Sequence, residues 1–144
     1  MRFLFVIIGL GLVGCAGKAP DLPRELTACP SSPNCVYTRT DAADEEHHIS
    51  PYTVDDPAAA WTALDTVVLG LPRVEKVDET ATTRHYVFTT ALMRFKDDVQ
   101  FELDAEGKAI HFRSASRVGR SDLGVNRKRM ETIRTQLEAA LGAP

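Results

Sequence analysis

Apolar residues spaced three and four positions apart predict a helix in the first half of the chain. Asp56 followed by Pro57 is typical of a helix start, because the carboxylate can cap free N–H groups and proline fits the first turn. Trp61, Leu64 and Val68 then recur at the spacing of an amphipathic helix, with the tryptophan in the core. A Gly-Leu-Pro step follows and is expected to end the helix.

Between positions 73 and 113 the pattern changes to a period of two, which indicates strands. The expected strands are RVEKVDE (73–79), RHYVFTTALM (84–93), DDVQFELD (97–104) and AIHFRS (109–114). In the third of them Val99, Phe101 and Leu103 point to one face and the polar residues to the other. A four-residue turn, AEGK, separates the last two strands and predicts an antiparallel hairpin.

Helical spacing returns after the last strand. A closing helix is predicted from the apolar residues Val125, Met130, Ile133, Leu137 and Leu141. The order helix, strands, helix indicates an α+β fold. We therefore expect a four-stranded antiparallel sheet with an N-terminal and a C-terminal helix packed on one face.

The chain begins with a positive Met-Arg pair and a continuous apolar run, FLFVIIGLGLV (3–13). A spanning helix needs about 20 apolar residues, so this run fits the hydrophobic region of a signal peptide better. It ends in LVGC (12–15), which resembles the lipobox of bacterial lipoproteins. We predict a signal peptide at 1–14, a lipidated tether at 15–27 and a single domain at 28–142.

The lipobox resemblance implies that Cys15 carries the lipid, with acyl chains such as palmitate holding the protein at a membrane. Ala16 follows, where an aspartate would signal inner-membrane retention. The expected location is therefore the cell envelope, at the outer membrane and facing the periplasm. An ordinary signal peptide with an incidental Cys15 is the alternative.

Removal of a signal peptide and lipidation of the first cysteine leave Cys29 and Cys35, in CPSSPNC. In an oxidising compartment two such cysteines predict a disulfide. Closing so small a loop stabilises the fold by roughly 2–2.5 kcal/mol in the chain-entropy model. A metal site with His47 or His48 is the alternative, but the five-residue gap does not match the usual zinc spacing.

The 144 residues are 44% hydrophobic, which is ordinary for one globular domain. The formal net charge of −3 gives no support to nucleic-acid binding. One stretch departs from this balance: RSASRVGRSDLGVNRKR (113–129) holds five arginines and one lysine, but a single acid. We therefore treat this stretch as the candidate site.

Two interpretations of the basic stretch stay open. A glycine-bearing loop that enters a helix N-terminus can bind a phosphate or carboxylate, such as a lipid head group or another anionic small molecule. Alternatively, the arginines pair with Asp97, Asp98, Glu102 or Glu131 and lock the loop to the sheet. The candidate residues are Arg113, Ser114, Ser116, Arg117, Arg120, Asp122, Asn126, Arg127 and Arg129.

No complete catalytic constellation is present in the sequence, and neither a metal nor a cofactor is expected. Ser114 and Ser116 lie near His111, but a strand turns His111 and Ser114 to opposite faces. Asp97 and Asp98 are adjacent, so a strand separates them in the same way and no acid–base pair is indicated.

Three segments, CPSSPNCV, FKDDVQFELD and RSASRVGRSDLGVNRKRME, resemble the domain-of-unknown-function 1499 family of bacterial envelope proteins. The resemblance covers about residues 26–141, and HHISPY departs from it by inserting Ser50. It implies a fold and a location but no established activity. We expect a non-enzymatic binding or structural lipoprotein; the alternative is an enzyme or binder that acts on an anionic envelope ligand through residues 113–129.

Overall fold

The computed structural model describes residues 25–142. The expected signal peptide, Cys15 and most of the expected tether therefore lie outside the described residues. Within residues 25–142 none of the helices has the length and apolar character needed to cross a membrane.

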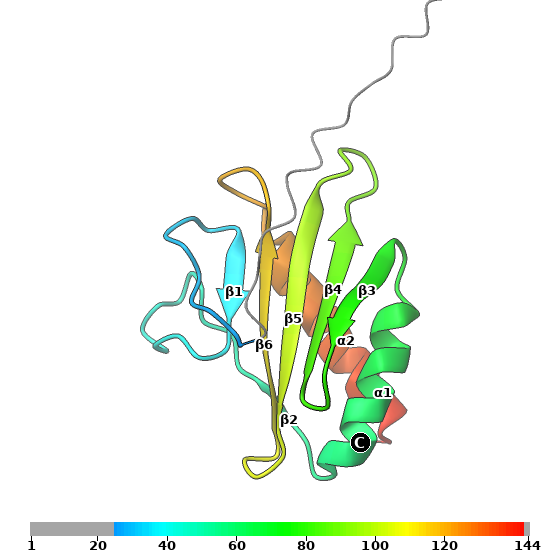
Figure 1. The fold of residues 1–144 in the computed structure, drawn as a ribbon. Helices are drawn as coiled ribbons and strands as arrows, with labels where there is room; N and C mark the ends of the chain where they lie inside the picture. Colours follow the sequence, from blue (N-terminus) through cyan, green and yellow to red (C-terminus); the bar gives the residue numbers. More distant parts are fainter. Residues whose placement is uncertain (1–24, 143–144) are drawn as a thin grey trace, which may run out of the picture.

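A single antiparallel sheet forms the centre of the molecule (Figure 1). Its strand order is β1-β6-β5-β4-β3, and β2 also pairs with β6. The strands are β1 (Cys35–Tyr37), β2 (Tyr52–Thr53), β3 (Val74–Glu79), β4 (Thr83–Thr89), β5 (Lys96–Asp104) and β6 (Ala109–Ser116).

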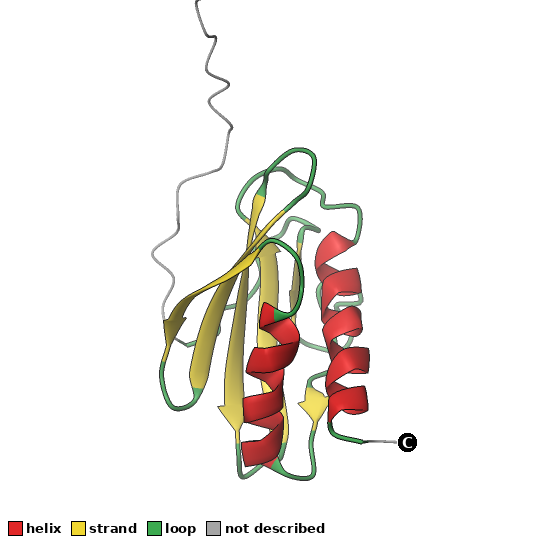
Figure 2. Ribbon diagram, turned by 90° about the vertical axis from the view of Figure 1, so that its right-hand side faces the viewer, coloured by secondary structure: helices red, strands yellow, loops and turns green. Residues whose placement is uncertain are grey.

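Two helices, α1 (Pro57–Leu69) and α2 (Val125–Ala140), lie side by side on the same side of the sheet (Figure 2). Asp56 caps α1 as expected, with Oδ1 accepting hydrogen bonds from the amides of Ala58 and Ala59. The core lies between the helices and the sheet, where Tyr86 and Phe101 from the strands are fully buried with residues of both helices. The α+β class is confirmed.

The sheet has six strands, so the expected four-stranded sheet was too small. The two additional strands, β1 and β2, both lie on the free side of β6. They are three and two residues long, too short to show a period along the sequence. Their burial comes from tertiary packing: Val36 and Tyr52 both belong to the hydrophobic core.

The second expected strand also ends earlier than its apolar pattern indicates. Strand β4 stops at Thr89, and the amide of Thr90 is bonded to the carbonyl of Phe95 across a loop. Leu92 and Met93 lie in that loop and are exposed. The apolar run of the sequence therefore continues beyond the strand that it was expected to form.

Three connections lie toward the upper end of the molecule in Figure 1. They are the α1–β3 loop (70–73), the β4–β5 loop (90–95) and the segment between β6 and α2 (117–124), which we call the arginine loop. Antiparallel pairing of β3 to β6 brings these loops to one end, because each second connection of such a sheet lies on the same side. The candidate site is at this end.

Candidate functional site

A buried ion pair joins α2 to the helix-covered face of the sheet. Nη2 of Arg129 donates to Oδ2 of Asp97 at 2.5 Å, and the Asp97 side chain is only 2% exposed. Nη1 of Arg129 donates to Oδ1 of Asn126 at 2.7 Å and to the hydroxyl of Ser114 at 3.2 Å. The guanidinium also lies 4.7 Å from the ring centroid of Phe88. Arg129 is therefore held in place by a carboxylate, an amide, a hydroxyl and an aromatic ring.

Asn126 is the centre of this polar network and is fully buried. Its Nδ2 donates to Oδ2 of Asp122 at 2.7 Å, to the hydroxyl of Ser116 at 3.0 Å and to the carbonyl of Asn34 at 3.1 Å. Its Oδ1 accepts from the Ser114 hydroxyl at 2.6 Å. One side chain thus connects β6, α2, the arginine loop and the segment before β1.

The arginine loop supplies its own anion to the start of α2. Gly124 precedes the helix with φ 77°, a left-handed conformation that suits glycine, and has no side chain to cap with. Asp122 takes that role: its carboxylate accepts from the amides of Gly124 at 3.0 Å and Asn126 at 2.7 Å. A basic first turn opposes the helix dipole, and this carboxylate offsets that effect.

A second buried ion pair lies on the opposite face of the sheet. Nε and Nη2 of Arg117 donate to the two carboxylate oxygens of Asp98, both at 2.8 Å, and His85 Nε2 lies 2.8 Å from Oδ1. Burial alone would raise the pKa of Asp98, but the hydrogen bonds with Arg117 and His85 outweigh it and lower that pKa. The bond to Asp98 in turn raises the pKa of Arg117.

The other arginines of the candidate site meet no carboxylate among the described residues. Arg113 is buried with no hydrogen-bond partner for its Nε, and burial lowers its pKa. Arg127 donates to the backbone carbonyls of Glu45 and Glu46, at 3.3 and 3.1 Å. Arg120 is exposed. The five arginines therefore differ in their surroundings: two are ion-paired, two are held without a carboxylate and one faces solvent.

Two of the four acids proposed as partners lie elsewhere. Glu102 accepts from Arg39 at 2.6 Å, and Glu131 accepts from Arg134 at 2.9 Å within α2. Only the adjacent pair in β5 reaches the basic stretch. The alternation of a strand explains this result, because it sends those two neighbours to the two faces that the arginine loop spans.

The disulfide expected between Cys29 and Cys35 is confirmed, with an S–S distance of 2.04 Å. The loop that it closes contacts the arginine loop, since Asn34 Nδ2 donates to the carbonyl of Gly119 at 2.8 Å. The disulfide loop therefore braces the arginine loop from the side of β1.

The two histidines considered for a metal site have structural contacts. His47 Nδ1 lies 2.8 Å from Oδ2 of Asp44, and its Nε2 lies 3.2 Å from the carbonyl of Ser32. Burial would lower the pKa of His47, but these bonds raise it. His48 forms an isolated bridge with Tyr37. Within the part of the chain that the structure describes, no three potential metal ligands come together.

The histidine considered for a serine dyad does not meet a serine. His111 Nδ1 lies 3.2 Å from the hydroxyl of Thr38, whereas Ser114 bonds to Asn126 on the helix-covered side. Burial and the nearby Arg39 lower the pKa of His111.

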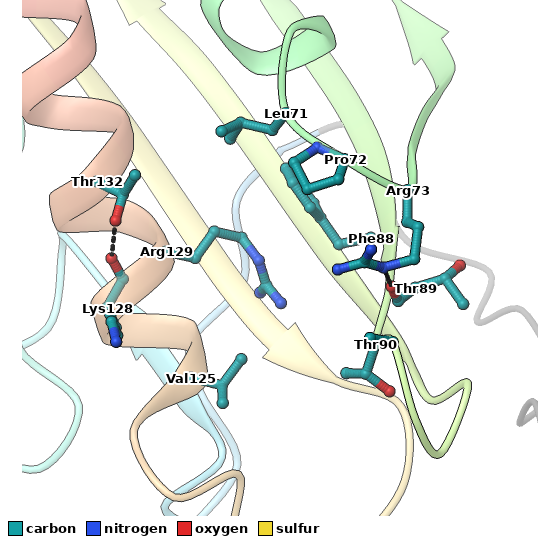
Figure 3. A pocket seen from close by; sticks show the side chains of 11 residues that line it. Leu71, Pro72, Arg73, Phe88, Thr89, Thr90, Val125, Lys128, Arg129 and Thr132 are labelled. Carbon is teal, nitrogen blue, oxygen red and sulfur yellow. Dashed lines mark hydrogen bonds between the residues drawn. The ribbon is translucent and has the colours of Figure 1, made fainter.

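A pocket of about 510 Å³ opens beside Arg129, between the α1–β3 loop, the end of β4 and the first turns of α2 (Figure 3). Figure 3 shows the Arg129 side chain reaching from α2 toward the β4 side of this space. Its lining combines an apolar part with cations and threonine hydroxyls. The residues are Leu71, Pro72, Arg73, Phe88, Thr89, Thr90, Ala91, Val125, Lys128, Arg129 and Thr132.

A smaller pocket of about 290 Å³ lies next to it, between the β4–β5 loop and the arginine loop. Both pockets share Thr90 and Val125. Asp97 and Asp122 line the smaller one, but both carboxylates are engaged by Arg129 and by the start of α2. Among the residues that line the two pockets, the cations without a carboxylate partner in the described chain, Arg73 and Lys128, belong to the larger one.

The comparison with known families gives one match. A family model described as "Protein of unknown function (DUF1499)" matches residues 25–137. The chain belongs to the DUF1499 family. No curated protein and no solved structure matches the chain. The matched DUF1499 range includes both pockets and both buried ion pairs.

Sequence reasoning missed several residues of this DUF1499 site. His85 and Asn34 carry no local pattern, because their partners lie in distant strands and loops. Leu71 and Phe88 were indistinguishable from ordinary core residues. Leu92 gave the one available signal: it extends an apolar run beyond the strand alternation of TRHYVFT.

Proposed function

We propose that this DUF1499 protein is a lipid-anchored envelope protein whose domain binds an amphiphilic anion in the larger pocket. The observation that carries the proposal is the pocket's combination of an apolar wall with unpaired cations. Lys128 is exposed and has no ion pair within residues 25–142, and within the same range the Arg73 side chain donates only to the Thr89 carbonyl. Such a lining suits an acyl or other apolar group that carries a phosphate or carboxylate.

The buried arginines stabilise the fold, and the lining of the larger pocket favours binding. Arg129 and Arg117 are each committed to a carboxylate, so neither is free to clamp a reacting group. The larger pocket is lined by cations, threonine hydroxyls and apolar groups. An enzyme acting on an anionic envelope substrate, the second candidate, needs a positioned acid, base or nucleophile beside the bound group.

Ligand binding can be tested by titrating the full chain with octyl phosphate in a calorimeter, with inorganic phosphate and octanol as the two partial probes. We expect octyl phosphate to bind at least tenfold more tightly than either partial probe. Lys128→Glu should remove most of that advantage. Lys108→Glu is the matched control, because Lys108 is an exposed lysine in the hairpin at the opposite end.

Equal binding of octyl phosphate by Lys128→Glu and the parent protein would contradict the pocket assignment. Turnover of octyl phosphate to free phosphate, assayed in the same samples, would favour the enzyme.

The membrane anchor rests on the sequence around Cys15, and its test is separate. Mass spectrometry of the protein from a membrane fraction should find acyl chains on Cys15. Cys15→Ser should give an unprocessed or released form. Unchanged acylation of the Cys15→Ser protein, or a parent protein without acyl chains, would contradict the anchor.

A further inference from the structure

Three large apolar side chains project from the upper end of the molecule. Leu92 is 89% exposed and Met93 60% exposed in the β4–β5 loop, and Leu123 is 94% exposed in the arginine loop. Single exposed apolar residues are common on protein surfaces. These three lie close together, because all of them line the smaller pocket. They therefore form one apolar tip on two neighbouring loops.

The backbone at this tip adopts conformations that ordinary residues avoid. Leu123 has φ 54° and Arg94 has φ 58°, both in the left-handed region. Because Leu123 is almost fully exposed, burial of its side chain does not compensate for this backbone conformation. Such outliers are typical of functional sites.

Unpaired positive charge surrounds the apolar tip. Arg94 and Arg120 are exposed and have no ion pair with a residue in the range 25–142. The nearby carboxylates of Asp97 and Asp122 are used internally, by Arg129 and by the amides at the start of α2. The tip is therefore apolar and cationic at once.

The opposite end of the molecule has a different character. Its connections carry Asp55 and Glu106, both exposed and without a side-chain partner among the described residues, and Lys108 is the exposed cation beside them. An anionic surface would therefore attract the upper end and repel the lower one. This difference in charge gives the molecule a preferred orientation at such a surface.

We propose that this apolar tip docks on an anionic lipid surface, with Leu92, Met93 and Leu123 entering the interface and Arg94 and Arg120 contacting head-group phosphates. Apolar insertion combined with basic residues is the usual chemistry of interfacial binding. The proposal rests on the proposed function for the anchor near Cys15. Ten Cα–Cα steps separate Cys15 from Glu25, the first described residue. A lipid on Cys15 would therefore keep Glu25 within about 36 Å of the membrane.

Docking also connects the tip with the larger pocket. The two pockets share lining residues, so a tip lying on lipid would place the mouth of the binding pocket beside the membrane. An amphiphilic anion could then enter the pocket from the lipid phase. The tip thereby deepens the proposed function by naming lipid as the source of the ligand.

The test places a fluorescent label on the full chain in a Cys15→Ser background. Cys29 and Cys35 are joined in the disulfide, so an introduced cysteine is the only reactive thiol. Ala91→Cys carries an environment-sensitive nitrobenzoxadiazole label at the tip, and Glu106→Cys carries it at the opposite end. With phosphatidylglycerol-containing vesicles we expect a several-fold rise in emission and a blue shift at position 91 only.

Two sets of variants then separate the contributions of the apolar and the basic residues to vesicle binding. Leu92→Ser with Leu123→Ser should abolish the emission change, and Arg94→Glu with Arg120→Glu should weaken vesicle binding at least tenfold. Val77→Ser is the matched control, since Val77 is an exposed apolar residue on β3. It should behave as the parent.

Vesicle flotation of the same samples distinguishes the two proposals. Because these samples carry Cys15→Ser, flotation tests docking apart from the lipid anchor. Protein that floats with its position-91 label still in water would overturn docking, and the pocket and the lipidation of Cys15 keep their own tests. An equal response to neutral phosphatidylcholine vesicles, or equal emission changes at positions 91 and 106, would also overturn it. A position-specific response, together with a parent protein that lacks acyl chains, would support docking and contradict the anchor.

Discussion

The same end of the molecule holds arginines in two contrasting environments. Arg117 and Arg129 are nearly buried, and each donates to a carboxylate that is 2% exposed. Arg94 and Arg120 are exposed and meet no carboxylate of the described chain. Residue type alone therefore does not indicate function here. The buried arginines stabilise the fold, and the exposed ones are available to an external anion.

The two environments differ because the sheet places a buried carboxylate next to Arg117 and Arg129 only. Asp97 and Asp98 are neighbours on β5 that face opposite sides of the sheet, so each needs its own cation. An unpaired carboxylate in either position would be strongly destabilising. Position 120 has no such carboxylate below it, so its charge remains free.

The largest effect is expected when the helix-side pair is broken. Arg129→Ala leaves Asp97 buried and unpaired, and also removes donors to Ser114 and Asn126. We expect the free energy of unfolding to fall by roughly 3–5 kcal/mol, measured by urea denaturation. Lys128→Ala is the matched control and should cost less than about 0.5 kcal/mol. A loss below about 1 kcal/mol in Arg129→Ala would contradict the assignment.

A somewhat smaller loss, about 3 kcal/mol, is expected for Arg117→Ala, because His85 still contacts Asp98. The effect should depend on pH. Since the folded pKa of Asp98 is lowered, its contribution is complete above the unfolded value of about 4 and is lost as pH falls through the folded value.

The difference in unfolding free energy between the parent and Arg117→Ala should therefore be largest near neutral pH and shrink as pH falls through the acid range, because a protonated Asp98 no longer needs the cation. Denaturation at a series of pH values checks this dependence. A difference that grows in acid would be inconsistent with the ion pair.

Removal of the Asp122 cap at the start of α2 should lower the free energy of unfolding by an intermediate amount. Asp122→Ala removes the acceptor for the amides of Gly124 and Asn126, so we expect a loss of about 1–2 kcal/mol in thermal or urea unfolding. Asp122→Asn should retain about half of the contribution, because it keeps one acceptor oxygen. Full stability of Asp122→Ala would show that the loop holds α2 without its carboxylate.

The smallest effect on stability is expected at the exposed arginine. Arg120→Ala should change the free energy of unfolding by less than about 0.5 kcal/mol. Arg120→Ala should nevertheless weaken binding to anionic vesicles. Arg129→Ala does not allow the same test, because it also destabilises the fold. A marked loss of stability in Arg120→Ala would remove the contrast between the two environments.

The regular elements between Pro57 and Ala140 were predictable because each has its own period. The Asp56 cap and apolar spacing predict the first helix, apolar spacing predicts the second, and the alternation of β5 predicts that Asp97 and Asp98 face opposite sides. Strands β1 and β2 were not predictable, since they are too short to show a period and depend on pairing with β6.

The candidate site was predictable only as a set of residues. The sequence indicates that the basic stretch needs anions, and it names Asp97 and Asp98 among the possible partners. It does not assign Arg117 to one and Arg129 to the other, because that choice depends on the path of the arginine loop around the sheet edge. The larger pocket brings together the α1–β3 loop, the end of β4 and the first turns of α2, which are far apart in the sequence, so no local pattern marks it.

The central claim is that buried ion pairs, rather than a bound anion, satisfy Arg117 and Arg129. A double-mutant cycle of Asp97→Ala and Arg129→Ala, measured by urea denaturation in phosphate-free buffer, tests it most directly. We predict a coupling free energy of about 1.5–3 kcal/mol that added phosphate leaves unchanged. Additive effects within about 0.5 kcal/mol, or a large stabilisation of the parent but not of Arg129→Ala by phosphate, would contradict it.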